Sequence, residues 1–194
     1  MHPSIAESLD LSDASSATVA LVADTHGQLD ARVADLAARC DAVVHAGDVG
    51  GRAVLAALTA DSTPLLAVRG NNDVPEKWPA GEGHLALALP AAAQLLLPGG
   101  ELALVHADAW PAAHRHHRLR ALFPEARAVA YGHSHRLAVD DEALPWLLNP
   151  GAAGRSRTFG GPSCLLLRAT FHHWEVEVHR FSLPVRPLAV GSAP

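Results

Sequence analysis

The sequence predicts an α/β fold built on a parallel sheet, and two observations support this prediction. Three apolar runs, at residues 18–23, 42–45 and 65–68, have the length and composition of buried strands. Between them, apolar residues recur at the three- and four-residue spacing of amphipathic helices. Strands and helices that alternate in this order form a parallel sheet joined by crossover helices.

The first half of the chain supplies this alternating unit. Residues 1–16 are polar and rich in Ser and Asp, and we expect them to form a flexible tail. The first helix is marked by Leu29, Val33, Leu36 and Cys40, and the second by Val54, Leu55 and Leu58. Because 194 residues suit one domain better than two, we expect a single domain over residues 17–194.

The second half of the chain changes pattern after residue 84. We expect strands at 85–87, 94–97, 102–105, 128–131, 144–148, 164–169 and 174–179, and one helix at 112–123. A Pro-Gly-Gly turn at residues 98–100 joins two of these strands. In the last strand, Trp174, Val176 and Val178 alternate with charged or polar residues, which predicts one packed face and one exposed face.

Composition narrows the class of protein. The formal charge of −5 argues against a broad basic surface for DNA or RNA. The N-terminal segment lacks the basic and apolar regions of a signal peptide, and no apolar run is long enough to span a membrane. Cys40 and Cys164 have no CxxC partner, so we expect them to be reduced packing residues. The prediction is therefore a cytoplasmic protein without a membrane partner or an extended nucleic-acid surface.

Four short polar motifs directly follow predicted strands. They are Asp24-Thr25-His26, Gly47-Asp48, Gly70-Asn71-Asn72-Asp73 and Gly132-His133-Ser134-His135, and His106 follows the strand at 102–105. Ligands bind at the carboxyl ends of strands in open α/β sheets. Residues i and i+2 of an extended chain share a face. Asp24 with His26, and His133 with His135, are therefore each expected to point into one site. Two carboxylates, one amide and four imidazoles suit a pair of divalent transition metals.

Each motif alone is weak evidence, because a Gly-Asp pair is usually a turn, but the ordered series is specific. It resembles the calcineurin-like metallophosphoesterase superfamily, with its D-x-H, GD, GN-x-D, H and GH-x-H blocks. The short length looks most like the small bacterial and archaeal phosphodiesterases of that superfamily. The resemblance runs from Val19 to Gly151 and includes the Asn-Pro-Gly at 149–151. It implies an α/β fold that is a four-layer αββα sandwich, with two mixed sheets flanked by helices.

The resemblance also implies how two metal ions would be held. It implies that Asp24, His26 and His135 bind one ion and that Asn71, His106 and His133 bind the other. Asp48 would bind both ions. A shared carboxylate would screen the repulsion between two cations, and a hydroxide bridging them would be the nucleophile. We expect Mn²⁺ in preference to Fe, Zn or Ni. Asp48, Asn72 and Asp73 are the candidate catalytic residues, with Asp73 expected to orient a neighbour or cap a turn.

Two positions depart from the family pattern. Many members have a histidine after the ligand asparagine, thought to protonate the leaving group, but this chain has Asn72, which has no acidic proton. We therefore expect a preference for activated or cyclic esters. The family's histidine-glycine pair is His106-Ala107 here. Asp108 then leaves open whether a phosphate-contacting histidine is missing.

Basic residues outside the motifs have alternative interpretations. His45 lies on a buried strand and is expected to be a hydrogen-bonded core residue rather than a ligand. The basic cluster at 114–120 is either a solvated helix face, which we favour, or a rim that attracts anionic substrates. The loop at 151–162 is expected to belong to the site. Its Arg155 and Arg157 could contact phosphate or simply lie at the surface.

The leading functional prediction is a phosphodiesterase or phosphatase of small phosphate esters, nucleotide-like substrates included. The rival is a non-catalytic, protein-binding scaffold with the same fold, as in the metallophosphoesterase-like subunit of eukaryotic retromer. The complete set of seven candidate ligands favours catalysis over the scaffold. A metallo-β-lactamase-type hydrolase is a third class, but its H-x-H-x-D-H signature is absent from the sequence. A homo-oligomer is left open, because small relatives often assemble.

Overall fold

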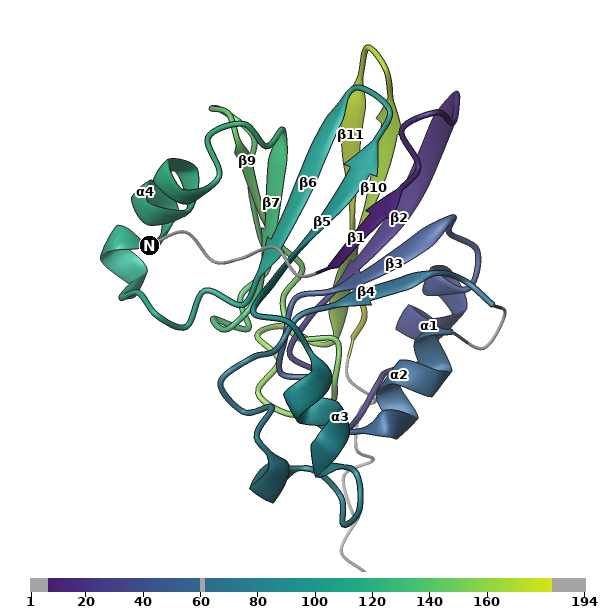
Figure 1. Cartoon of the computed structure of the whole chain (residues 1–194), viewed down its shortest axis with the longest axis vertical. Helices are drawn as coiled ribbons and strands as arrows, with labels where there is room; N and C mark the ends of the chain where they lie inside the picture. The colour runs from purple at the N-terminus through teal and green to yellow at the C-terminus, as the bar shows by residue number, and fades with distance from the viewer. Residues whose placement is uncertain (1–6, 60–61, 183–194) are drawn as a thin grey trace, which may run out of the picture.

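Two β-sheets face each other at the centre of the computed structural model, and helices lie on their outer sides (Figure 1). The structure describes residues 7–59 and 62–182. One sheet has five strands in the order β11-β10-β2-β3-β4, and the other has six in the order β1-β5-β6-β7-β9-β8. Both sheets combine parallel and antiparallel pairs. The predicted αββα sandwich of two mixed sheets is confirmed.

The five-stranded sheet contains the predicted β-α-β-α-β unit. Its elements are β2 (Ser16–Val22), α1 (Ala31–Ala37), β3 (Ala42–His45), α2 (Arg52–Leu58) and β4 (Leu65–Ala67), with β10 (Ser163–Thr170) and β11 (Trp174–Arg180) added at one edge. The strands β2, β3 and β4 are parallel, whereas β10 runs antiparallel to both of its neighbours. In β11 Trp174 is buried, but Val178 is 49% exposed. The predicted packed face therefore ends before Val178.

The six-stranded sheet is built from the second half of the chain and one early strand. Its elements are β1 (Glu7–Asp10), β5 (Ala92–Leu97), β6 (Gly100–Val105), β7 (Ala128–Tyr131), β8 (Ala138–Asp140) and β9 (Trp146–Asn149), with α4 (Ala112–Leu122) between β6 and β7. The central strands β6, β7 and β9 are parallel. Their carboxyl ends therefore meet at one edge of this sheet.

Three apolar layers hold the four structural layers together. The central layer lies between the sheets and joins side chains such as Leu21 and Leu165 of one sheet to Leu104 and Leu148 of the other. A second layer packs α1, α2 and a short helix, α3 (Gly83–Ala88), against the outer face of the five-stranded sheet. The third layer packs α4 against the outer face of the six-stranded sheet. Cys40 and Cys164 are free thiols within the second layer, as expected for reduced packing residues.

Two local predictions are wrong. The tail expected over residues 1–16 contains β1, which pairs in parallel with β5; residues 1–6 lie outside the described residues. The strand expected at 85–87 is helix α3 (Gly83–Ala88), because Leu85, Ala86 and Leu89 pack together against the five-stranded sheet. A short apolar run does not distinguish a strand from a helix. Strand β8 and the 3₁₀ turn η1 (Pro75–Lys77) were not predicted.

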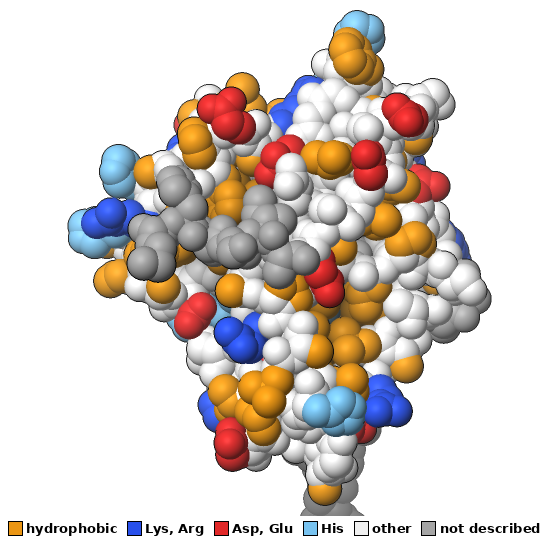
Figure 2. Space-filling view, in the orientation of Figure 1, with side chains coloured by type: hydrophobic (Ala, Val, Ile, Leu, Met, Phe, Trp, Pro, Cys, Tyr) orange, Lys and Arg blue, Asp and Glu red, His pale blue; other side chains and the backbone are white. Residues whose placement is uncertain are grey.

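The surface viewed in Figure 2 carries charges of both signs. On this face, Lys and Arg side chains lie apart from one another, with acidic and hydrophobic side chains between them. Among the described residues no helix has the length and apolar character needed to cross a membrane.

Candidate metal centre

All seven candidate ligands lie where strands of both sheets end, at one end of the sandwich. Asp24 and His26 follow β2, Asp48 follows β3, Asn71 follows β4, His106 follows β6, and His133 and His135 follow β7. The contacts described below connect these side chains across the gap between the sheets. His26 and His135, which are 109 residues apart in sequence, thus come into contact.

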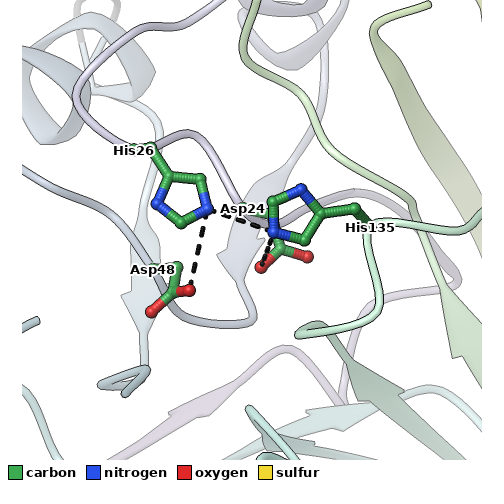
Figure 3. Close-up of side chains that lie close together, drawn as sticks. All are labelled: Asp24, His26, Asp48 and His135. Atoms are coloured by element: carbon green, nitrogen blue, oxygen red, sulfur yellow. Dashed lines mark hydrogen bonds and ion pairs between the residues drawn. The ribbon is translucent and has the colours of Figure 1, made fainter. Parts of the chain in front are cut away.

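Four side chains form what we call the first ligand group: Asp24, His26, Asp48 and His135 (Figure 3). One ligand atom from each lies within 4.8 Å of the others. The Nε2 atoms of His26 and His135 are 3.2 Å apart. His135 Nε2 is 3.6 Å from Asp24 Oδ1, and His26 Nε2 is 3.7 Å from Asp48 Oδ2. These nitrogens and oxygens point toward one another, as the ligands of one cation must.

The second ligand group consists of Asn71, His106 and His133, together with Asp48. The amide oxygen of Asn71 is 3.2 Å from His106 Nε2 and 3.0 Å from His133 Nδ1. His106 Nε2 is also 3.4 Å from Asp48 Oδ2. His133 and His135, two residues apart, thus belong to different groups.

Asp48 connects the two groups through a single atom. Its Oδ2 faces His26 of the first group and His106 of the second. Asn72 fixes the orientation of this carboxylate, because its backbone N–H donates to Oδ1 and its side-chain amide donates to Oδ2, each at 2.7 Å. A carboxylate held between two sets of nitrogen and oxygen ligands is the arrangement expected for a shared ligand of two cations.

The backbone at the site is strained. Five candidate ligands are among the non-glycine residues with positive φ: Asp24 (53°), His26 (47°), Asp48 (57°), His133 (71°) and His135 (57°). This left-handed region is unfavourable for L-residues and is found where function requires it. The extended conformation predicted from the motif spacing is therefore wrong. Left-handed residues at the strand ends, rather than an alternating strand, direct these side chains into the site.

Two glycines of the motifs leave room for the ligands. A Cβ atom at position 70 would overlap the backbone nitrogen and Oδ1 of Asp48. Gly47 has a φ of 92°, and a Cβ there would overlap the His106 ring. The motif glycines are thus required because ligand side chains pack directly against their backbone.

The first ligand group is electrostatically prepared for a cation. Asp24 is fully buried, and burial raises the pKa of its carboxyl to about 7. Its Oδ2 has no hydrogen-bond partner among the described residues. Burial also lowers the pKa of His26, and it lowers that of His135 to about 4, so both imidazoles are neutral at pH 7. A buried, unpartnered carboxylate oxygen beside neutral imidazoles is stabilised by a bound cation.

His106 and Asp48 shift each other's pKa. Burial disfavours the charged form of each. The hydrogen bond and charge attraction between them outweigh it, raising the pKa of His106 to about 9 and lowering that of Asp48. His106 Nδ1 lies 2.8 Å from the Ala46 carbonyl oxygen and donates to it. Because Nδ1 is already engaged, Nε2, which faces Asp48 and Asn71, is the nitrogen from which a metal ion would displace the proton.

Comparison with known proteins assigns the family. The sequence model for the calcineurin-like phosphoesterase superfamily domain matches residues 18–170, which is most of the chain. The chain belongs to the calcineurin-like phosphoesterase superfamily. No curated protein matches the sequence.

Solved structures of similar fold come from both prokaryotes and eukaryotes. A predicted phosphoesterase from Streptococcus pneumoniae shares 20% identity with a TM-score of 0.61, over 86% of this chain and 91% of that one. Vacuolar protein sorting 29 (Vps29) from Cryptosporidium parvum shares 18% identity with a TM-score of 0.65, over 88% of this chain and 100% of that one. Vps29 from Entamoeba histolytica, complexed with Zn²⁺, shares 16% identity with a TM-score of 0.62, over 84% and 98%. At these levels of sequence identity, the structural similarity shows only that the fold is shared.

The donor set of this calcineurin-like phosphoesterase fits divalent metal ions. Each ligand group offers carboxylate or amide oxygen together with two imidazoles, the mixture that first-row transition metals bind. The unpartnered Oδ2 of Asp24 supports the same conclusion, because a buried carboxylate oxygen normally has a partner. The structure thus contains a candidate metal cluster. The number and identity of the metals are part of the proposal below.

The other candidate catalytic residues have different surroundings. Asn72 holds Asp48, as described, and its Oδ1 accepts a hydrogen bond from Lys77 Nζ at 2.6 Å. Asp73 is fully buried and accepts hydrogen bonds from the backbone N–H groups of Val49, Gly50 and Gly70 and from the indole of Trp78. Asp73 therefore positions the loops after β3 and β4, which agrees with the expectation that it orients its neighbours.

Outside the ligand groups, one prediction holds and one is partly wrong. His45 is fully buried and its Nε2 is hydrogen-bonded to Thr25 Oγ1 at 2.9 Å, as expected of a core residue. The basic cluster is not simply a solvated face, because Arg115 is buried and donates to the carbonyl oxygens of Ala107 and Trp110. Arg115 therefore anchors the loop that follows His106.

The loop at 151–162 reaches the site, as predicted. Arg155 and Arg157 are both exposed, and Arg157 Nη2 lies 2.8 Å from His26 Nε2. Lys77 was overlooked as a site residue, although it is the only lysine in the sequence. Its five-residue separation from Asn72, in a segment with no predicted helix, gave no signal that the two side chains meet.

Proposed function

We propose that this protein is a binuclear metal-dependent phosphoesterase, and specifically a cytoplasmic phosphodiesterase of small phosphate esters, nucleotide-like esters included. The observation that carries the proposal is the position of Asp48. Its Oδ2 lies 3.7 Å from His26 Nε2 in one group and 3.4 Å from His106 Nε2 in the other. A single ion site would not need two sets of imidazoles beside one carboxylate oxygen.

The protein's own groups would each have a defined task. Asp24, His26 and His135 would hold one cation, Asn71, His106 and His133 the other, and Asp48 would contact both. When bound, two divalent cations supply a water activated as nucleophile at neutral pH and neutralise charge on the phosphoryl oxygens. Asn72 keeps the shared carboxylate oriented, and the Ala46 carbonyl keeps His106 in the correct tautomer. Mn²⁺ is the proposed ion, with Fe, Zn and Ni as alternatives.

The leaving group would depart without strong acid assistance. The position after the ligand asparagine is Asn72, whose oxygen accepts from Lys77 and whose amide donates to Asp48. Neither group of this amide is an acid. The proposal therefore includes a preference for activated or cyclic esters, and comparable turnover of nitrophenyl and unactivated alkyl esters would contradict that preference.

The test is a hydrolysis screen after complete removal of metal. The chelated protein is refilled with Mn²⁺, Zn²⁺, Ni²⁺ or Fe²⁺ and assayed with bis(p-nitrophenyl) phosphate, p-nitrophenyl phosphate and a set of cyclic nucleotides. We expect no activity without metal, restored activity with Mn²⁺, and faster hydrolysis of the diester. Metal-loaded protein that hydrolyses neither ester nor any cyclic nucleotide would contradict the proposal.

A non-catalytic scaffold is the second candidate, because several of the similar solved structures are Vps29 proteins. A scaffold would bind metal without hydrolysing any ester in the screen. The two proposals therefore differ in turnover and agree on metal binding.

A further inference from the structure

An apolar cavity of about 520 Å³ opens directly beside the second ligand group. Asn71 and His106, both candidate ligands, form part of its wall. Most of the remaining wall is apolar and includes Val74, Leu87 and Trp110. Cavities of this size with apolar walls and a few polar groups are typical of small-molecule sites.

The packing of the fold explains only part of this apolar wall, because Trp110 and Leu122 lie against the third apolar layer but Leu87 belongs to none of the three layers. Leu87 lies on α3 and is 63% exposed, although the opposite side of that helix packs in the core. Trp110 is half buried and lies in the loop that Arg115 anchors. These side chains face the cavity from two different elements, α3 and the β6–α4 loop. An exposed leucine and a tryptophan beside a polar centre indicate a surface that an apolar group covers.

A second recess, beside the same centre, is different in chemistry. It has a volume of about 210 Å³ and is lined by His26, Asp48, Gly50, Asn72 and Lys77. Its wall thus contains an ammonium group and an amide, which suit the oxygen atoms of a phosphate. The centre therefore has a polar recess next to Asp48 and an apolar cavity next to Asn71.

We infer that the apolar cavity binds a bulky, apolar ring carried on the phosphate-bearing ligand. This inference rests on the proposed function, because it places the phosphate at the metal centre. A phosphate held between the two ligand groups would leave one substituent beside Asn71 and His106, at the mouth of the cavity. Burial of a ring there removes apolar surface from water, and a methyl substituent would leave the cavity unfilled.

Binding of phosphonates tests this inference without requiring turnover. Benzylphosphonate and methylphosphonate carry the same charged group on a non-hydrolysable carbon–phosphorus bond and differ only in the ring. Calorimetry on the Mn²⁺-loaded protein should give at least about tenfold tighter binding of benzylphosphonate, which corresponds to about 1.4 kcal/mol. Equal affinities for the two phosphonates would overturn the inference.

Variants that fill the cavity provide a second test. Ala91 and Ala109 line the cavity, are exposed, and do not have positive φ, so a larger side chain is accepted there. Ala91→Phe and Ala109→Phe should each weaken benzylphosphonate binding about fivefold or more and leave methylphosphonate binding unchanged. Ala56→Phe, at an exposed position on α2, is the matched control and should change neither. Unchanged benzylphosphonate binding in both cavity variants would also overturn the inference.

Hydrolysis of bis(p-nitrophenyl) phosphate by the same preparations separates the two proposals. Metal-dependent hydrolysis without a preference for the benzyl ligand would reject the cavity and retain the enzyme. A benzyl preference without hydrolysis would reject the enzyme and retain the cavity as a binding site.

Discussion

The two ligand groups around Asp48 differ in charge and in backbone strain. The first contains two carboxylates, Asp24 and Asp48, whereas the second has only the shared carboxylate and the neutral amide of Asn71. All four residues of the first group have positive φ, but in the second group Asn71 and His106 do not. The first group therefore combines more negative charge with a more constrained backbone. We infer that it binds its cation more tightly, and that the second cation is the exchangeable one.

Asp48→Asn has the largest expected effect, because it removes the charge that both groups share. Both cations should bind more weakly, and the rate of metal-dependent hydrolysis should fall by about 10³-fold or more. Steady-state kinetics with saturating Mn²⁺ measures the rate, and Asp35→Asn, the same change at an exposed position on α1, is the control. Retained activity in Asp48→Asn would show that this carboxylate is not shared.

Two further substitutions test the difference between the groups. Asp24→Asn should abolish the tight site, whereas Asn71→Ala should weaken only the second site, by roughly 10–100-fold. Calorimetric titration with Mn²⁺ should show one tight and one weaker site in the unaltered protein. The same titration of Asn71→Ala should still show the tight site. If Asn71→Ala instead removed the tighter site, the order of affinities inferred here would be reversed.

The pH dependence of stability sharpens the same comparison. Asp24 has a pKa of about 7 in the folded protein, against 3.8 as its ordinary value. The folded state therefore holds this proton more tightly, and the metal-free protein loses stability as the pH rises from about 4 to about 7. Asp24→Asn does not ionise, so its stability relative to the unaltered protein should increase by about 2–3 kcal/mol between pH 5 and pH 8. Urea denaturation of both proteins without metal measures this difference. A constant difference would mean that Asp24 ionises normally.

Substitution of Arg157 has the smallest expected effect on metal binding and on activity. Its guanidinium lies 2.8 Å from His26 Nε2, the nitrogen that faces the first cation position. Arg157→Gln removes a charge that opposes a cation there, so we expect Mn²⁺ to bind a few-fold more tightly. If the loop also contacts phosphate, the Michaelis constant should rise in the same variant. A change in neither quantity would show that the contact has no role in the site.

The sequence predicted the site better than it predicted the backbone that forms it. The order of the motifs was sufficient to select seven side chains that converge, because each motif follows a strand and parallel strands end at one edge. The predicted extended geometry is wrong, because five of these residues lie in the left-handed region and not in an extended strand. A propensity for positive φ is too weak in Asp and His to be recognised from sequence.

Other errors arose where tertiary packing decides between alternatives. The apolar run at 85–87 became a helix because its side chains pack on one face, and residues 7–10 became a strand because β5 offered a free edge. Arg115 was taken for a solvated residue, but it pairs with carbonyl groups of a loop that no local pattern places near it. The apolar cavity depends on α3 and on the β6–α4 loop, and neither conformation was predictable locally.

Anomalous diffraction from crystals grown with Mn²⁺ would locate both cations. We expect two manganese peaks about 3.5–4 Å apart. The Asp48 carboxylate should coordinate both, with Asp24 beside one peak and Asn71 beside the other. A single peak, or two peaks of which one lies out of reach of Asp48, would contradict this expectation.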